Sequence, residues 1–159
     1  MKLVHKQINS LRFGVLTGLV LLSLVFANVA SALEFRSVSV SKAILYDAPS
    51  EQAQKIFILN DGYPVEVIVN LGEWIKVRDH YGALSWILGK QLSLKRTVLV
   101  IGGKAEIRQL DSDTSPLLAT LEKDVVVEVV STNSQNGWIK IKHRDGITGF
   151  VRVSQVWGF

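Results

Sequence analysis

Cysteine is absent from the 159 residues. A chain without cysteine has no disulfide, no thiolate metal site, no cysteine nucleophile and no acylated lipoprotein cysteine. The stability of its folded part must therefore come from the burial of apolar side chains and from strand pairing. Histidine is also scarce, with three in the whole chain. Few groups are thus left for acid–base catalysis or metal binding, and we predict neither an enzyme nor a cofactor.

Residues 1–32 have the pattern of a secretory signal peptide. A basic start (Lys2, Lys6, Arg12) precedes an almost unbroken apolar run (13–27) and a small-residue cleavage site, Ala30-Ser31-Ala32. The alternative is an uncleaved signal anchor, because residues 13–33 are nearly long enough to span a bilayer. The small residues favour cleavage after Ala32, and with it a periplasmic or secreted protein. No later apolar stretch is long enough to cross a membrane.

The charge of the predicted mature chain is nearly balanced. The leader contains three of the 18 lysines and arginines and none of the 14 acidic residues, so residues 33–159 hold 15 basic and 14 acidic side chains. A nucleic-acid-binding domain needs a strongly basic face. We therefore predict no nucleic-acid partner.

One pattern occurs twice, at residues 74–87 and 138–151. Each copy reads as an alternating strand, a polar turn with glycine and a second apolar strand, which indicates a β-hairpin. The flanking residues repeat as well: Ala43 and Ala105 are 62 positions apart, as are Leu59 and Leu121, whereas Trp74 and Trp138 are 64 apart. One gap in a connecting loop aligns the copies, so we predict two domains, residues 33–94 and 95–159.

Short strands with turns every eight to twelve residues favour a small barrel or sandwich in each domain. The predicted fold class is all-β, with two tandem small barrels and no helix after the leader. Gly102-Gly103 is predicted to form a hairpin turn between strands 97–101 and 105–108. The polar stretch 131–137 is predicted to be a loop.

Strand alternation assigns the two faces of the repeated hairpin. Ile75 and Val77, with Ile139 and Ile141, are predicted to face the core. Trp74 and Trp138 then share the opposite face with lysines, and we expect that face to be outward or to line a groove. The alternative is that these two indoles cap the end of a barrel core.

At this point the sequence resembles a known family, the Src-homology-3-like (SH3b) domains of exported bacterial proteins. The residues that carry the resemblance in the second repeat are Val127-Glu128-Val129, Gly137-Trp138-Ile139-Lys140-Ile141, Asp145-Gly146, Gly149-Phe150-Val151 and Ser154-Gln155-Val156. Those in the first repeat are Gly62-Tyr63-Pro64-Val65-Glu66-Val67, Trp74-Ile75-Lys76-Val77-Arg78-Asp79 and Arg96-Thr97-Val98-Leu99-Val100. The resemblance covers nearly all of the predicted mature chain and implies two tandem SH3-like barrels.

The resemblance implies a non-catalytic binding or adaptor protein of the cell envelope, with peptidoglycan or an envelope protein as its partner. The candidate ligand-binding residues are Trp74, Trp86, Trp138, Lys140 and Phe150. An indole can stack on a sugar or a peptide while a nearby lysine attracts a carboxylate. The polar residues of loops 47–55 and 109–116 would help to select the ligand. The alternatives are a small hydrolase or metal-dependent factor, and a purely structural pair of barrels.

The remaining polar and terminal residues have simpler interpretations. His80 and His143 fall in hairpin turns at non-equivalent positions, so we predict exposed turn histidines. Asp111 and Asp113 are too few for a calcium site and indicate a polar turn. Trp157 and Phe159 are predicted to hold the C-terminal tail in the seam between the two domains.

Overall fold

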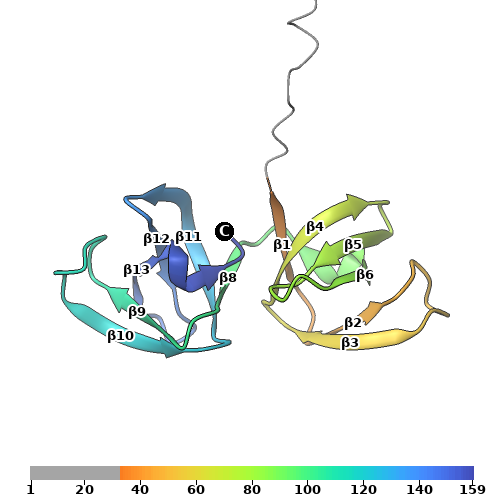
Figure 1. Ribbon diagram of the computed structural model, residues 1–159, viewed down its shortest axis with the longest axis horizontal. Coiled ribbons are helices and arrows are strands. Elements are labelled where there is room, and N and C mark those ends of the chain that lie inside the picture. Colours follow the sequence, from red (N-terminus) through yellow and green to blue (C-terminus); the bar gives the residue numbers. More distant parts are fainter. Residues whose placement is uncertain (1–32) are drawn as a thin grey trace, which may run out of the picture. The chain divides into compact units, whose positions relative to one another are not determined.

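The computed structural model describes residues 33–159, which form two antiparallel β-sheets of seven strands each (Figure 1). The signal peptide predicted at residues 1–32 lies outside the described residues. The helical segments of the described part are two three-residue 3₁₀ turns, η1 (Gly89–Gln91) and η2 (Val153–Gln155). No helix in residues 33–159 is long and apolar enough to cross a membrane.

The first sheet is built from the first repeat. Its strands are β1 (Glu34–Val38), β2 (Lys42–Tyr46), β3 (Lys55–Asn60), β4 (Pro64–Asn70), β5 (Trp74–Arg78), β6 (Leu84–Leu88) and β7 (Leu92–Ser93). Their order across the sheet is β3-β2-β6-β5-β4-β1-β7. The predicted central hairpin is confirmed as β5 and β6, in which Trp74 pairs with Leu88 and Lys76 with Trp86.

The second sheet repeats this arrangement. Its strands are β8 (Thr97–Val100), β9 (Lys104–Arg108), β10 (Leu117–Glu122), β11 (Val126–Gln135), β12 (Trp138–Lys142), β13 (Thr148–Arg152) and β14 (Val156–Trp157). Their order is β10-β9-β13-β12-β11-β8-β14, which is the first order with each strand number raised by seven. The all-β fold with two tandem SH3-like domains is therefore confirmed. The predicted boundary between residues 94 and 95 falls between β7 and β8.

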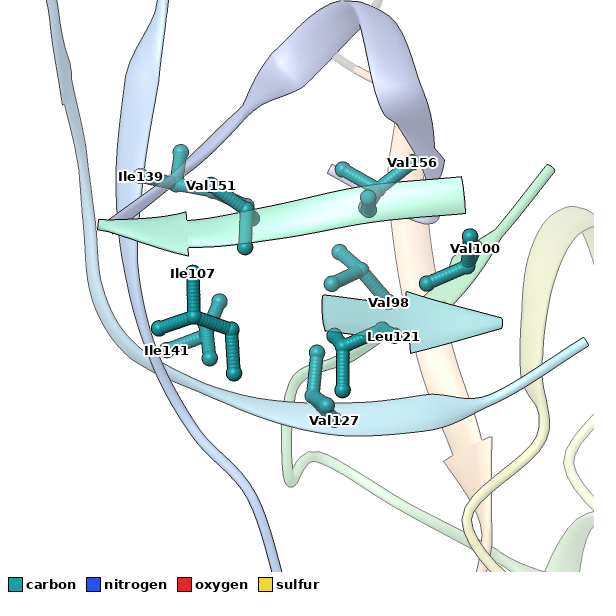
Figure 2. Close-up of a cluster of buried hydrophobic side chains, with 10 residues drawn as sticks. Val98, Val100, Ile107, Leu121, Val127, Ile139, Ile141, Val151 and Val156 are labelled. Atoms are coloured by element: carbon teal, nitrogen blue, oxygen red, sulfur yellow. The ribbon is translucent and has the colours of Figure 1, made fainter. Parts of the chain in front are cut away.

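Each sheet encloses its own apolar core. The first core contains Ile75 and Val77, and the second contains Ile139 and Ile141, as the alternation predicted. Figure 2 shows the second cluster, in which β-branched side chains from several strands meet. Full burial of one such side chain stabilises a fold by about 1.5–3 kcal/mol. A chain without disulfides thus has a substantial source of stability in each half.

The glycine pair Gly102-Gly103 joins two strands that do not pair with each other. β8 pairs with β11 and β14, whereas β9 pairs with β10 and β13. The predicted hairpin between these strands is therefore wrong. Two neighbouring apolar strands with a glycine turn match a hairpin locally, but the strand order of the whole sheet separates β8 from β9.

The predicted loop 131–137 is wrong for most of its length, because β11 continues to Gln135. Its pairing with β12 shifts register twice, between Val129 and Ser131 and between Ser131 and Gln135. Asn136 and Gly137 then turn the chain with φ angles of 52° and 78°. An Asn-Gly turn with two positive φ angles matches the twist of a hairpin, so polar residues can continue as paired strands up to it.

Residues 33–159 form one compact unit, and specific contacts join its two barrels. The hydroxyl oxygens of Ser37 and Thr97 are 2.6 Å apart and buried, and Thr97 Oγ1 donates a hydrogen bond of 2.6 Å to the carbonyl of Gly62. The ring of Trp157 meets that of Phe35 edge to face, with centroids 5.1 Å apart. We call this contact region the seam. The prediction that Trp157 holds the tail there is confirmed, and Phe159 packs against the second core.

Candidate functional site

Two of the predicted ligand-binding residues are buried. Trp74 is 9% exposed and Trp138 is 4% exposed. Trp74 meets the Tyr46 ring edge to face at 5.3 Å, and the two form a small cluster with Leu88. The guanidinium of Arg152 lies 4.6 Å from the centroid of the Trp138 ring. The expectation of an outward or groove-lining face is therefore wrong for these two indoles, which cap their barrels instead.

Covering loops explain this burial. In the first barrel, Ala53 from the loop between β2 and β3 packs against the cluster around Trp74. In the second barrel, Arg152 stacks on Trp138 and is bonded at both Nε and Nη2 by the carboxylate of Asp113, from the loop between β9 and β10. The same ion pair holds the pKa of Asp113 below its usual range, chiefly through the hydrogen bond from Arg152. Asp113 thus holds a loop in place.

The other predicted residues lie at the surface in a repeated arrangement. Trp86 is half-buried on β6, and the Lys76 ammonium lies 5.8 Å from its ring centroid. Phe150 occupies the equivalent place on β13, with the Lys140 ammonium at 6.0 Å. We call each aromatic–lysine pair a platform. Platforms at equivalent positions of both barrels offer an aromatic surface beside a cation, which is a suitable combination for sugars and carboxylates.

A groove of about 380 Å³ lies elsewhere, beside β3. Residues of both repeats line it: Phe57, Ile58, Leu59, Asn60, Tyr63, Asp79, His80, Tyr81, Leu99 and Asp124. Two of its aromatic side chains are largely accessible, since Phe57 is 63% and Tyr81 73% exposed. Its charged groups are the carboxylates of Asp79 and Asp124, and the lining contains no lysine or arginine. The groove is therefore aromatic and acidic, and it suits an apolar ligand that carries a cation.

A tyrosine–histidine pair forms the inner part of this groove. The Tyr63 hydroxyl lies 2.5 Å from His80 Nδ1. Burial, followed by the nearby charge of Asp79, raises the pKa of Tyr63 from 10.0 to about 12. Tyr63 is thus protonated at neutral pH, and its hydroxyl can donate to Nδ1 of the tautomer that carries its proton on Nε2. That Nε2 atom is buried and has no hydrogen-bond partner within residues 33–159.

His80 and His143 are both half-buried, so the prediction of exposed turn histidines is wrong for both. The His80 ring is tilted by 42° against the Tyr81 ring, with centroids 3.7 Å apart, and its centroid lies 6.3 Å from that of the Trp157 ring. The tail of the second repeat and the turn of the first repeat meet around this imidazole. A turn motif alone does not reveal that another part of the chain covers it.

Replacing Tyr63 with phenylalanine should lower the free energy of unfolding by about 1 kcal/mol, because His80 Nδ1 loses its donor. It should also change the alkaline behaviour. The folded-state pKa of Tyr63 is raised, so its contribution is complete below pH 10 and is lost as the pH rises towards about 12. Urea unfolding at several pH values should show wild-type stability declining across this range and the Y63F variant declining less. Parallel decline of both proteins would contradict the assignment.

The described residues offer little for catalysis. Within residues 33–159, no three His, Asp or Glu side chains are grouped to hold a metal ion. His143 Nδ1 lies 3.3 Å from Asp145 Oδ2, with both residues in one turn. His80 is bonded to a tyrosine, and Asp113 to an arginine.

Sequence reasoning missed the groove. Its lining comes from the β3 strand, the β5–β6 turn and two separate segments of the second repeat. One local feature does fall in it, the continuous apolar run Ile56-Phe57-Ile58-Leu59, although 43–46 and 98–101 are runs of the same kind. A second signal is the pair of neighbouring rings His80-Tyr81 in a turn that otherwise requires only polar residues.

Comparison with family models matches the bacterial SH3 domain twice, over residues 39–93 and 102–158. Comparison with curated proteins yields no match. Similar solved structures include NlpC2 and NlpC1 from Trichomonas vaginalis, with TM-scores of 0.37 for both and identities of 14% and 15%. These alignments cover 79% and 82% of this chain and 48% and 47% of those chains.

An NlpC/P60 family protein from Bacillus cereus is also similar, with a TM-score of 0.35 and 16% identity. That alignment covers 77% of this chain and 55% of the other. The chain thus spans about half the length of each of these three proteins.

Proposed function

We propose that this chain, which belongs to the bacterial SH3 domain family, is a non-catalytic binding module of the cell envelope with peptidoglycan as its ligand. The main observation in support of this proposal is that the platform occurs in both barrels. Trp86 with Lys76 and Phe150 with Lys140 place the same two chemical groups at equivalent positions of two barrels. A periodic polymer is the kind of ligand that two equal sites on one chain suit.

The chemistry of the platforms supports this ligand class. The apolar face of a sugar ring stacks on an aromatic side chain, and an ammonium beside the ring attracts a carboxylate of an attached peptide. One such contact is weak, with aromatic stacking contributing about 0.5–1.5 kcal/mol. Two contacts on one polymer act together, because the second forms at the high effective concentration that the first creates.

Export and location are part of the proposal. The predicted leader at residues 1–32 would send the protein to the periplasm or outside the cell, where peptidoglycan is accessible. The near balance of charges in residues 33–159 leaves no reason for a nucleic-acid ligand. The module would act as an adaptor in the wall.

Co-sedimentation of residues 33–159 with purified peptidoglycan tests the proposal. We expect the wild-type protein to sediment, and the double variant Trp86→Ala with Phe150→Ala to bind about tenfold more weakly, because two stacking contacts are lost. Each single variant should lose about threefold. Circular dichroism must show that every variant remains folded.

A control is Tyr81→Ser, which removes a more exposed ring from the groove and should leave wall binding unchanged. Absence of wild-type sedimentation would refute peptidoglycan as the ligand. Sedimentation that persists in the folded double variant would place the wall-binding surface elsewhere and remove the platforms from the proposal.

A further inference from the structure

The edge of the first sheet is the most exposed apolar segment of the described chain. β3 is the terminal strand of its sheet and pairs only with β2. Three consecutive residues in it are exposed: Ile56 at 45%, Phe57 at 63% and Ile58 at 54%. An edge strand presents unpaired N–H and C=O groups, and proteins usually protect such edges with charges, proline or bulges. The segment 56–59 contains no charged residue and no proline, although its pairing with β2 has a bulge at Ile56.

The equivalent edge of the second sheet, β10, is less apolar. β10 follows Pro116, and its pairing with β9 shifts register between Leu117 and Ala119. The pairing of β3 with β2 has the same irregularity, a register shift between Leu45 and Tyr46 that leaves Ile56 of β3 without a partner on β2. Thr120 of β10 stands where β3 has Ile58, 62 positions earlier. The two edges thus share a bulge and differ in apolar character, because β3 has Phe57 and Ile58 where β10 has Ala119 and Thr120.

The groove adjoins the β3 edge. Phe57, Ile58, Leu59 and Asn60 of β3 form one of its sides. A strand added beside β3 would direct alternate side chains towards Asp79 and Asp124. The Oδ1 atom of Asp79 accepts hydrogen bonds from the backbone of Tyr81 and Ala83, whereas the Asp124 carboxylate has no ion-pair partner in residues 33–159. The groove therefore supplies negative charge beside a free strand edge.

We infer that β3 is a docking edge for an extended polypeptide segment of a partner protein, which pairs with the β3 backbone and places basic side chains in the acidic groove. Backbone pairing supplies affinity in such complexes, and the pockets for alternate side chains supply specificity. The charge of the groove selects a basic segment over an acidic one. This surface is separate from the platforms, so the chain has one surface for the wall and another for a protein.

The occupant is a polypeptide rather than a glycan, because a glycan lacks the amide groups that an open strand edge requires. A second copy of this chain is a weaker match. Its own β3 carries one basic residue, Lys55, at the start of an apolar run. The β3 strand of a second copy would therefore not place basic side chains at alternate positions beside the groove carboxylates.

Amide hydrogen exchange, read by NMR on residues 33–159, tests the inference with a short synthetic peptide that alternates lysine and valine. We expect saturating peptide to slow exchange of the β3 amides that do not bond β2 by about tenfold or more, and to leave the β10 amides unchanged. Fluorescence anisotropy should show Ile58→Gln weakening binding about threefold to tenfold and Thr120→Gln having no effect.

Two control peptides separate pairing from charge. The same sequence methylated at every backbone nitrogen keeps its charges but cannot form a ladder, and it should not bind. An alternating glutamate–valine peptide should not bind either. Equal binding of the methylated peptide, or protection of β10 in place of β3, would overturn the inference.

Two further outcomes are informative. Dimerisation by wild type that Ile58→Gln abolishes, without any binding of the lysine–valine peptide, would assign the edge to a second copy and refute a partner protein. The double variant Trp86→Ala with Phe150→Ala should bind the peptide normally. Absence of wild-type sedimentation with peptidoglycan, with the peptide still bound, would refute the proposed function and leave this inference standing. Wild-type sedimentation without any peptide binding would refute this inference and leave the proposed function standing.

Discussion

Replacing Trp138 with alanine should lower the free energy of unfolding by about 3–5 kcal/mol. The Trp138 ring is buried at the end of the second core, so its removal leaves a cavity that the surrounding strands fill only in part. The change also removes the surface on which the Arg152 guanidinium stacks. Denaturant unfolding followed by circular dichroism measures the loss directly. We therefore do not expect Trp138 to report on ligand binding separately from folding.

The matched control is Trp86→Ala, because Trp86 is an indole of the same hairpin motif that remains half-buried. Its truncation removes less buried surface, and we expect a loss of about 1 kcal/mol. A Trp138 variant that lost less than the Trp86 variant would contradict the assignment of Trp138 to the core. The comparison also identifies Trp86 as the residue to change when binding is measured.

The cores were predictable because alternation determines which side chains share a face. Ile75, Val77, Ile139 and Ile141 are each at most 1% exposed. The repeated register also predicted that the two halves would have one topology, as the strand orders confirm. Alternation does not determine which face is covered. The loops that bury Trp74 and Trp138 follow paths set by their own packing. The prediction that these two indoles face outward or line a groove was therefore wrong.

The groove was not predictable because it depends on distant segments. Phe57 and Tyr81 are 24 positions apart, and Leu99 and Asp124 belong to the other repeat. Hydrophobic periodicity describes one strand at a time and contains no information on how two barrels meet. A continuous apolar run such as Ile56–Leu59 is consistent with a buried strand. Only the position of β3 at the sheet edge shows that most of it is exposed.

Replacing Gly158 with alanine should lower the free energy of unfolding by about 2–4 kcal/mol, from backbone strain and overpacking together. Gly158 has a φ angle of 111°, a conformation that residues with a Cβ rarely adopt. A Cβ there would lie 2.8 Å from Pro64 Cβ and 2.9 Å from the carbonyl oxygen of Thr97. The Gly158 carbonyl also accepts a hydrogen bond of 3.0 Å from Arg96, so a shift of this backbone disturbs the seam.

We also expect the G158A change to weaken peptide binding at the groove. Trp157, next to Gly158, pairs in register with Leu99, which lines the groove, and its ring lies near that of His80. The G158A variant should therefore bind the lysine–valine peptide more weakly at temperatures where it is still folded, and sediment with peptidoglycan as wild type does. Gly103→Ala is the matched control, since a Cβ at Gly103 meets no atom within 4 Å.

Unchanged stability of G158A would mean that the tail adapts at no cost and that the seam is not rigid. A stability loss with unchanged peptide binding would separate the seam from the groove, and the β3 edge would then have to bind its partner without support from the second barrel.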